Sequence, residues 1–120
     1  VIATGALVYK AIVAAKNFSE KGISVKVLNM ATIKPLDNEA VIELAKEAGA
    51  IVTVEEHQVF GGLGSAVSEV LSQNYPVPQE FIGVKDKFGQ SGKPEELLEH
   101  YGLGISHIEA AIEKVLKRKG

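Results

Sequence analysis

The chain has 120 residues, a length that suits one domain with its own core. Thirteen basic and fifteen acidic residues leave a formal charge of −2, which excludes the general positive field of a nucleic-acid-binding protein. Cysteine is absent, so disulfides, thiolate nucleophiles and cysteine metal ligands are excluded, and a cytoplasmic protein is expected. No apolar run reaches the length of a membrane span, so we expect no membrane association.

The first half of the chain alternates between strand and helix patterns. Val1–Thr4 predicts a short strand, and apolar residues at helical spacing predict a helix that ends near Gly22. Alternating residues over Ser24–Met30 predict a second strand. Asp37 is a favourable N-cap for a second helix, which Gly49 ends.

The second half continues the alternation. Ala50–Val54 predicts a third strand, residues 63–71 a third helix and Phe81–Val84 a fourth strand. Pro94 marks the start of a short helix. Ser106, with Glu109 three residues later, has the spacing of a capping box and predicts the start of the last helix.

This alternation predicts an α/β fold. We expect a three-layer α/β/α sandwich whose sheet has four to five strands and is mostly parallel, with a mixed sheet as the alternative. Residues 1–120 form one predicted domain. Because the sequence starts without methionine in what reads as the middle of a strand, we expect it to be a fragment of a longer polypeptide.

The most informative stretch runs from the third strand into the third helix. Glu55, Glu56 and His57 follow the apolar strand, at the sheet edge where α/β proteins bind ligands. Adjacent strand residues point to opposite faces, so Glu55 and Glu56 cannot serve one site together unless the strand has ended. Solvated strand-end charges are therefore favoured over a catalytic pair.

A glycine-rich turn formed by Gly61, Gly62, Gly64 and Ser65 opens the third helix. Its backbone amides are candidates for anion binding, as at other helix N-termini. The G-x-G-x-x-G fingerprint is incomplete, because Val67 stands where the third glycine belongs. A tight turn or a close contact is the simpler interpretation, and a stand-alone nucleotide- or anion-binding module remains the alternative.

The three histidines, His57, His100 and His107, have no helical metal-ligand spacing. Structural or surface roles are favoured for all three. From the residues alone, the sequence predicts one α/β domain with a prominent loop at one sheet edge, and no particular reaction.

Four separated segments together resemble the C-terminal domain of transketolase-type enzymes. They are V-E-E-H-Q at 54–58 with G-G-L-G-S-A-V at 61–67, V-I-A-T-G at 1–5, N-M-A-T-I-K-P-L-D at 29–37, and D-K-F-G-Q-S-G at 86–92 with L-L-E-H-Y-G-L at 97–103. The same domain occurs in deoxyxylulose-phosphate synthase and in 2-oxoacid dehydrogenase beta subunits. The last two segments look most like transketolase, especially the split form whose C-terminal half is a separate subunit.

The resemblance implies a division of labour between domains. Thiamine diphosphate and Mg²⁺ would lie between two other domains of the parent enzyme, which moves a two-carbon ketol unit between sugar phosphates. The resemblance therefore implies no catalytic, cofactor-binding or metal-binding residue in this chain. It implies a characteristic loop with a packing or interdomain role for Glu55, Glu56, His57, Gly61, Gly62, Gly64 and Ser65.

The expected partners follow from the same resemblance. They are the cofactor- and pyrimidine-binding domains, in the same chain or in a second subunit, within a homodimer or a heterotetramer. The chain alone is expected to support packing and dimerisation and not to catalyse the reaction.

Overall fold

Four parallel strands form the central sheet of the computed structural model, which describes residues 1–5, 7–30, 37–58, 62–84 and 104–119. Their order is β2-β1-β3-β4, so the first strand lies inside the sheet. The strands are β1 (Ile2–Ala3), β2 (Leu28–Asn29), β3 (Ile51–Gln58) and β4 (Gln79–Val84). Every strand pair in the described part of the chain is parallel, which confirms the predicted sheet.

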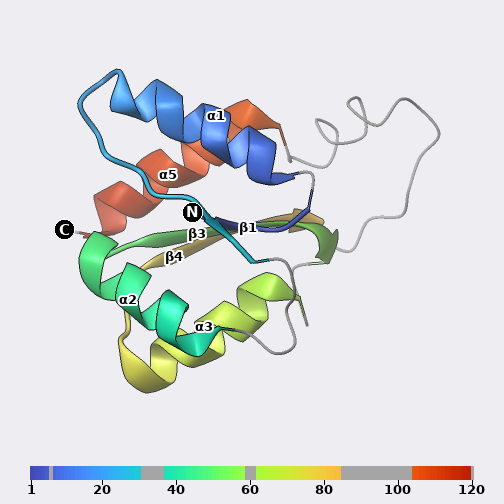
Figure 1. Ribbon diagram of the computed structural model, residues 1–120, viewed down its shortest axis with the longest axis vertical. Coiled ribbons are helices and arrows are strands. Elements are labelled where there is room, and N and C mark those ends of the chain that lie inside the picture. The colour runs from blue at the N-terminus through green and yellow to red at the C-terminus, as the bar shows by residue number, and fades with distance from the viewer. Residues whose placement is uncertain (6, 31–36, 59–61, 85–103, 120) are drawn as a thin grey trace.

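Helices cover both faces of this sheet. They are α1 (Leu7–Ser19), α2 (Asn38–Ala48), α3 (Leu63–Asn74) and α5 (Ile105–Lys119). Figure 1 shows α1 and α5 on one face and α2 and α3 on the other. The predicted three-layer sandwich is therefore confirmed. None of the described helices has the length and apolar character that crossing a membrane requires.

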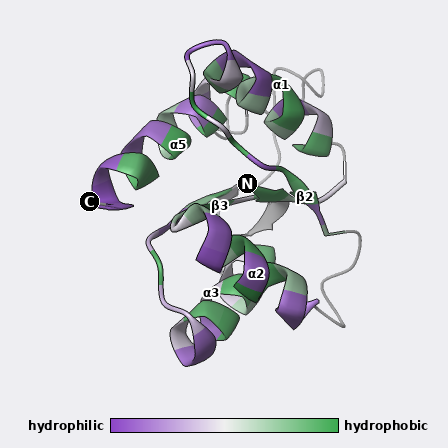
Figure 2. Cartoon of the chain, turned by 60° about the vertical axis from the view of Figure 1, so that its left-hand side comes forward, coloured by the Kyte–Doolittle hydropathy of each residue, from purple (hydrophilic) through white to green (hydrophobic). Residues whose placement is uncertain are grey.

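Two buried clusters of apolar side chains hold the three layers together. On the side of α1 and α5, Leu7 and Phe18 pack with Ile108 and residues around it, and on the side of α2 and α3, Val41 packs with Leu63 and its neighbours. Successive residues of β1 serve the two clusters alternately, since Val1 and Ala3 belong to the first and Ile2 to the second. The apolar faces of the helices turn toward the sheet (Figure 2).

Local sequence signals set both ends of α2 as predicted. The side chain of Asp37 accepts a hydrogen bond from the backbone N–H of Ala40 at 3.1 Å. At the other end, Gly49 adopts a left-handed conformation with φ 75°, and its N–H donates to the carbonyl of Ala45. A residue with a Cβ is disfavoured in that conformation, which explains the glycine.

The predicted start of the last helix was wrong by a few residues. Helix α5 begins at Ile105, so Ser106 lies inside its first turn, and the carbonyl of Gly104 accepts the first backbone hydrogen bonds. The side chain of Glu109 instead accepts a hydrogen bond from the Asn17 amide at 2.7 Å and joins α5 to α1. The short helix predicted from Pro94 falls outside the described residues.

The predicted second strand, Ser24–Met30, is longer than the observed β2. A strand forms only where a neighbour continues the ladder, and β1 offers a partner only from Val1 onward. The α-amino group of Val1 itself acts as a ladder donor, with its nitrogen 2.7 Å from the carbonyl oxygen of Lys26. Val1 is only 7% exposed, so this terminal ammonium group is buried.

This burial predicts a pH-dependent stability between pH 6 and 8. Desolvation lowers the pKa of the Val1 amine from 8.0 to about 6 in the folded chain. Below pH 6 the Val1 amine is charged in both the folded and the unfolded chain, so folding pays the full desolvation cost of the charge. Above pH 8 the amine is neutral in both states, and this cost is absent. The free energy of unfolding should therefore rise by about 3 kcal/mol across this window through this group alone.

Urea denaturation at pH 5.5, 7 and 8.5 measures the effect, with the Nα-acetylated chain as the control. The acetylated chain should lack this part of the pH dependence, because it carries no titratable amine. The prediction would be contradicted if the free energy of unfolding changed equally with pH in the free and the acetylated chains.

Candidate functional site

The centre of the predicted site is a buried carboxylate, Glu55, at the start of α3. Its side chain accepts a hydrogen bond from the backbone N–H of Leu63 at 2.9 Å and another from that of Gly64 at 2.7 Å. Glu55 is 2% exposed, so the expectation of a solvated strand-end charge is wrong for this residue: its carboxylate bonds to backbone amides and not to water. A negative group at the N-terminus of a helix satisfies amides that have no partner inside the helix and interacts favourably with the helix dipole. Glu55 therefore anchors α3 to β3.

The preceding residues of β3 explain why Glu55 faces α3. Ile51 belongs to the cluster on the α2 and α3 side, whereas Val52 and Val54 belong to the opposite cluster. Glu55 is four residues after Ile51, so the alternation of the strand places it on the same side. The ladder with β4 has an irregular register between Val54 and Gln58, the interval that contains Glu55.

A second set of contacts fixes the first turn of α3 against the sheet. The amide of Gln79 on β4 donates to the hydroxyl oxygen of Thr53 at 3.2 Å and to the carbonyl oxygen of Gly64 at 3.1 Å. Gly64 is packed so closely that an added Cβ would lie 2.5 Å from a ring carbon of Phe81 and 3.0 Å from the hydroxyl oxygen of Thr53. The glycine thus permits close approach of helix and sheet, the simpler of the two interpretations of this turn.

The predicted site residues divide between described and undescribed positions. Glu55, Gly62, Gly64 and Ser65 are described and lie around the start of α3, with Gly62 in the N-cap position. Glu56 and His57 belong to β3, which continues to Gln58, but their side chains fall outside the description. Gly61 falls outside it as well. Glu55 and Glu56 both belong to β3, and the divergence of their side chains stays a prediction.

Thr53, Gln79 and Phe81 were not predicted as members of this cluster. Thr53 is 1% exposed inside the apolar run Ile51–Val54 at the start of β3, and a polar residue in such a run was the available signal. No comparable signal marked Gln79 or Phe81, because their role depends on which strand lies beside β3.

The comparisons with known proteins agree with this architecture. Residues 1–108 match the family "Transketolase, C-terminal domain". The chain belongs to the transketolase C-terminal domain family.

Similar transketolase subunits extend well beyond this domain. The chain is 44% identical over 119 residues to the 6-deoxy-6-sulfo-D-fructose transketolase subunit SqwH of Clostridium sp., covering 99% of this chain and 37% of that protein. It is 48% identical over 118 residues to an apulose-4-phosphate transketolase subunit of Phocaeicola vulgatus, covering 98% and 38%. 1-Deoxy-D-xylulose-5-phosphate synthases also match, at lower identity. The chain thus spans less than two-fifths of these two transketolase subunits.

A solved structure shares both the fold and the sequence of this domain. It is described as "Split gene transketolase, inactive beta4 tetramer", with 49% identity and a TM-score of 0.95. The match covers 99% of this chain and 39% of the other. The resemblance to the C-terminal section of split transketolase is therefore confirmed.

The transketolase family implies thiamine diphosphate in the parent enzyme. Among the described residues, no cluster of three or more His, Asp or Glu side chains is arranged to hold a metal ion. The buried carboxylate of Glu55 is engaged by two backbone amides of its own chain. No step of cofactor chemistry is assigned to this domain.

Proposed function

We propose that the chain is the accessory C-terminal domain of a cytoplasmic, thiamine-diphosphate-dependent transketolase-type enzyme. The parent enzyme would transfer a two-carbon ketol unit between sugar phosphates. The observation that carries this proposal is the match of 99% of this chain to part of a split transketolase chain, at a TM-score of 0.95 and 49% identity. The similar subunits are named for different sugars, so no single substrate is chosen.

Packing and assembly are the proposed roles of this domain. The remaining domains or subunit would bind the cofactor, and this chain would pack against them and support a homodimer or heterotetramer. The description of the similar structure as a β4 tetramer supports a role in assembly. The loop from Glu55 to Ser65, which includes Glu56, His57, Gly61, Gly62 and Gly64, is the proposed place of an interdomain contact. Glu55 would contribute by holding the start of α3 in position.

The chain alone is expected not to bind thiamine diphosphate. Isothermal titration with thiamine diphosphate and Mg²⁺ measures this directly, and we expect no binding heat up to millimolar cofactor. The matched positive control is the assembled parent enzyme under the same conditions. Micromolar binding by the isolated chain would contradict the accessory role.

The alternative, a stand-alone anion-binding module, requires donors that the chain already uses. The N–H groups of Leu63 and Gly64 donate to Glu55, so two of the amides at this turn are engaged within the chain. Titration with nucleotides and sugar phosphates, followed by amide chemical shifts, separates the two functions. Localised shifts from Gly62 to Ser65 would favour the module, and unchanged shifts would favour the accessory domain.

A further inference from the structure

Two large apolar side chains lie exposed on the outer face of α1. Tyr9 is 71% exposed and Ile12 is 52% exposed, and they are one helical turn apart. In the part of the chain that the structure describes, the only other exposed large apolar residue is Tyr75, which follows α3. Single apolar residues are ordinary on a protein surface, whereas two neighbours on one helix form a patch.

This patch continues along the helix as a stripe of four residues. Val13 lies four residues after Tyr9, and Lys16 lies four residues after Ile12, so all four side chains lie along one side of α1. We call these four residues the outer stripe. The opposite side of α1, which faces the sheet and α5 (Figure 1), is formed by the buried residues Leu7, Ala11, Ala14 and Phe18.

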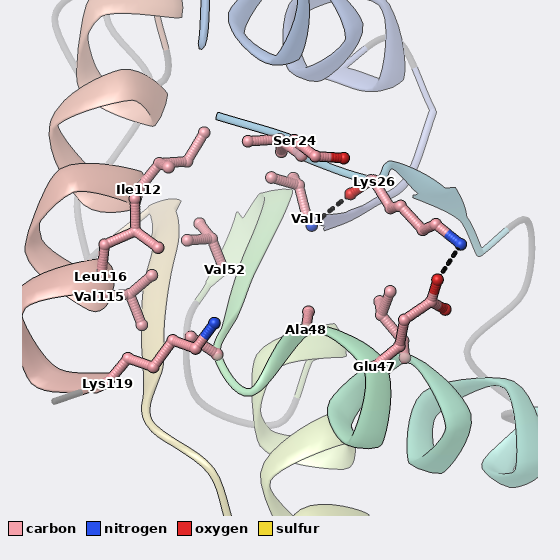
Figure 3. A pocket seen from close by; sticks show the side chains of 13 residues that line it. Val1, Ser24, Lys26, Glu47, Ala48, Val52, Ile112, Val115, Leu116 and Lys119 are labelled. Carbon is pink, nitrogen blue, oxygen red and sulfur yellow. Dashed lines mark hydrogen bonds and ion pairs between the residues drawn. The ribbon is translucent and has the colours of Figure 1, made fainter. Parts of the chain in front are cut away.

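Charged side chains at two other helices are paired within the chain. Lys26 forms an ion pair with Glu47 near the end of α2 (Figure 3), and Glu80 of β4 forms one with Arg118 of α5. The outer stripe of α1 is different, because it contains no acidic residue and its one charged residue is Lys16. It therefore presents an apolar centre with a cation at one end and an aromatic ring at the other.

The order of residues in the outer stripe is complementary to its own reverse. When two copies of α1 pack antiparallel about a two-fold axis between Ile12 and Val13, each Ile12 faces the Val13 of the other copy, and each Tyr9 faces a Lys16. A lysine ammonium group over a tyrosine ring is an attractive contact. In a parallel pair the two lysines would face each other, which like charges disfavour. The pattern therefore favours an antiparallel pair of identical helices.

We propose that the outer stripe of α1 binds the same stripe of a second copy of this chain in an antiparallel, two-fold symmetric contact. The inference rests on the proposed function, in which this domain supports assembly, and it names the surface and the partner. The similar split transketolase structure is described as a β4 tetramer. A tetramer built from two-fold contacts uses two different self-complementary surfaces on each copy.

The contact is expected to be weak in the isolated domain. Four side chains on two turns of helix bury far less than the roughly 1,200 Å² at which stable interfaces begin. We therefore expect a dissociation constant of about 0.1–1 mM. Within a larger assembly, other contacts between the copies would raise the effective concentration of the two stripes, so a weak contact is sufficient there.

Single-cysteine variants test this arrangement, because the chain has no cysteine of its own. Ile12→Cys places a thiol beside the two-fold axis, within reach of its counterpart in the other copy. Lys16→Cys is the matched control on the same stripe, since the two thiols would lie about 10 Å apart along the helix axis. With oxidised glutathione and 1 mM protein, the Ile12→Cys chain should form a disulfide dimer at least ten times faster than the Lys16→Cys chain. A mixture of the Tyr9→Cys and Lys16→Cys chains should form the mixed dimer faster than either chain forms its own.

The unmodified chain gives an independent readout. Between about 0.05 and 1 mM protein, the amide chemical shifts from Tyr9 to Lys16 should change with concentration, because the dissociation constant lies in this range. Ile12→Glu should abolish these changes, since it places a carboxylate at the centre of the contact. Tyr75→Glu makes a similar exposed substitution away from α1 and should leave the changes intact. Circular dichroism verifies that both variants are folded.

Three results would overturn the proposal. Equal rates of disulfide formation in the Ile12→Cys and Lys16→Cys chains would exclude the antiparallel contact. Shifts that do not depend on concentration up to 1 mM would assign the stripe to another domain of the parent enzyme. Concentration-dependent shifts around Tyr75 and not on α1 would place self-association on a different surface. These readouts involve no cofactor, so they fail or succeed separately from the cofactor titration that tests the proposed function.

Discussion

Replacing Glu55 with alanine should lower the free energy of unfolding by about 4 kcal/mol. The substitution leaves the buried N–H groups of Leu63 and Gly64 without an acceptor and opens a void beneath α3. Each unsatisfied buried donor costs about 1–3 kcal/mol, and the loss of a negative group at the helix N-terminus adds to this. Urea denaturation followed by circular dichroism measures the change.

Two further variants make this prediction specific. Glu55→Gln keeps the size of the side chain and one oxygen acceptor but turns an NH₂ group toward a backbone donor, so an intermediate loss is expected. Glu69→Ala removes an exposed carboxylate from the same helix and should change stability by less than about 0.5 kcal/mol. A Glu55→Ala chain as stable as the Glu69→Ala chain would refute the anchoring role.

Gly64→Ala should destabilise the chain by about 2 kcal/mol. In an exposed helix the same change would stabilise by about 1 kcal/mol, so the direction of the effect is diagnostic. The new Cβ would overlap the ring of Phe81, at 2.5 and 2.9 Å from two of its carbons, and would press on Thr53. Thermal unfolding of the variant measures the loss.

A double-mutant cycle with Phe81→Leu identifies the cause. The smaller side chain removes the ring that the Cβ would meet, so Gly64→Ala should cost less in the Phe81→Leu background. A difference of at least about 1 kcal/mol between the two backgrounds is expected for residues in direct contact. If the effects of Gly64→Ala and Phe81→Leu on stability were additive, the Phe81 ring would not be the cause of the destabilisation.

The parts of the fold that depend on local signals were predictable from the sequence. Both ends of α2 follow from Asp37 and Gly49, which satisfy backbone groups within a few residues of themselves. The α/β class and the parallel sheet follow from the alternation of patterns along the chain. The start of α5 was not predictable, because Glu109 bonds to Asn17 on another helix and not to the N-terminus of its own.

In the candidate site too, local features were predictable from the sequence and contacts between distant elements were not. The sequence placed acids, glycines and a helix start in one short stretch. It did not show that the Glu55 carboxylate would turn back onto the amides of Leu63 and Gly64. That contact depends on how α3 packs against β3. The closeness of Gly64 to Phe81 depends in the same way on how α3 packs against β4. Neither follows from residue spacing alone.

The interior position of β1 has a consequence for how the chain is made. Among the described strands, β1 precedes the other three along the chain and joins the two halves of the sheet, with β2 on one side and β3 on the other. Pairing on its second side therefore waits until β3 has left the ribosome. Until then the nascent chain exposes a strand edge and the apolar residues that flank it. A chaperone, or a previously folded upstream domain that shields this edge, would be most useful during that interval of synthesis.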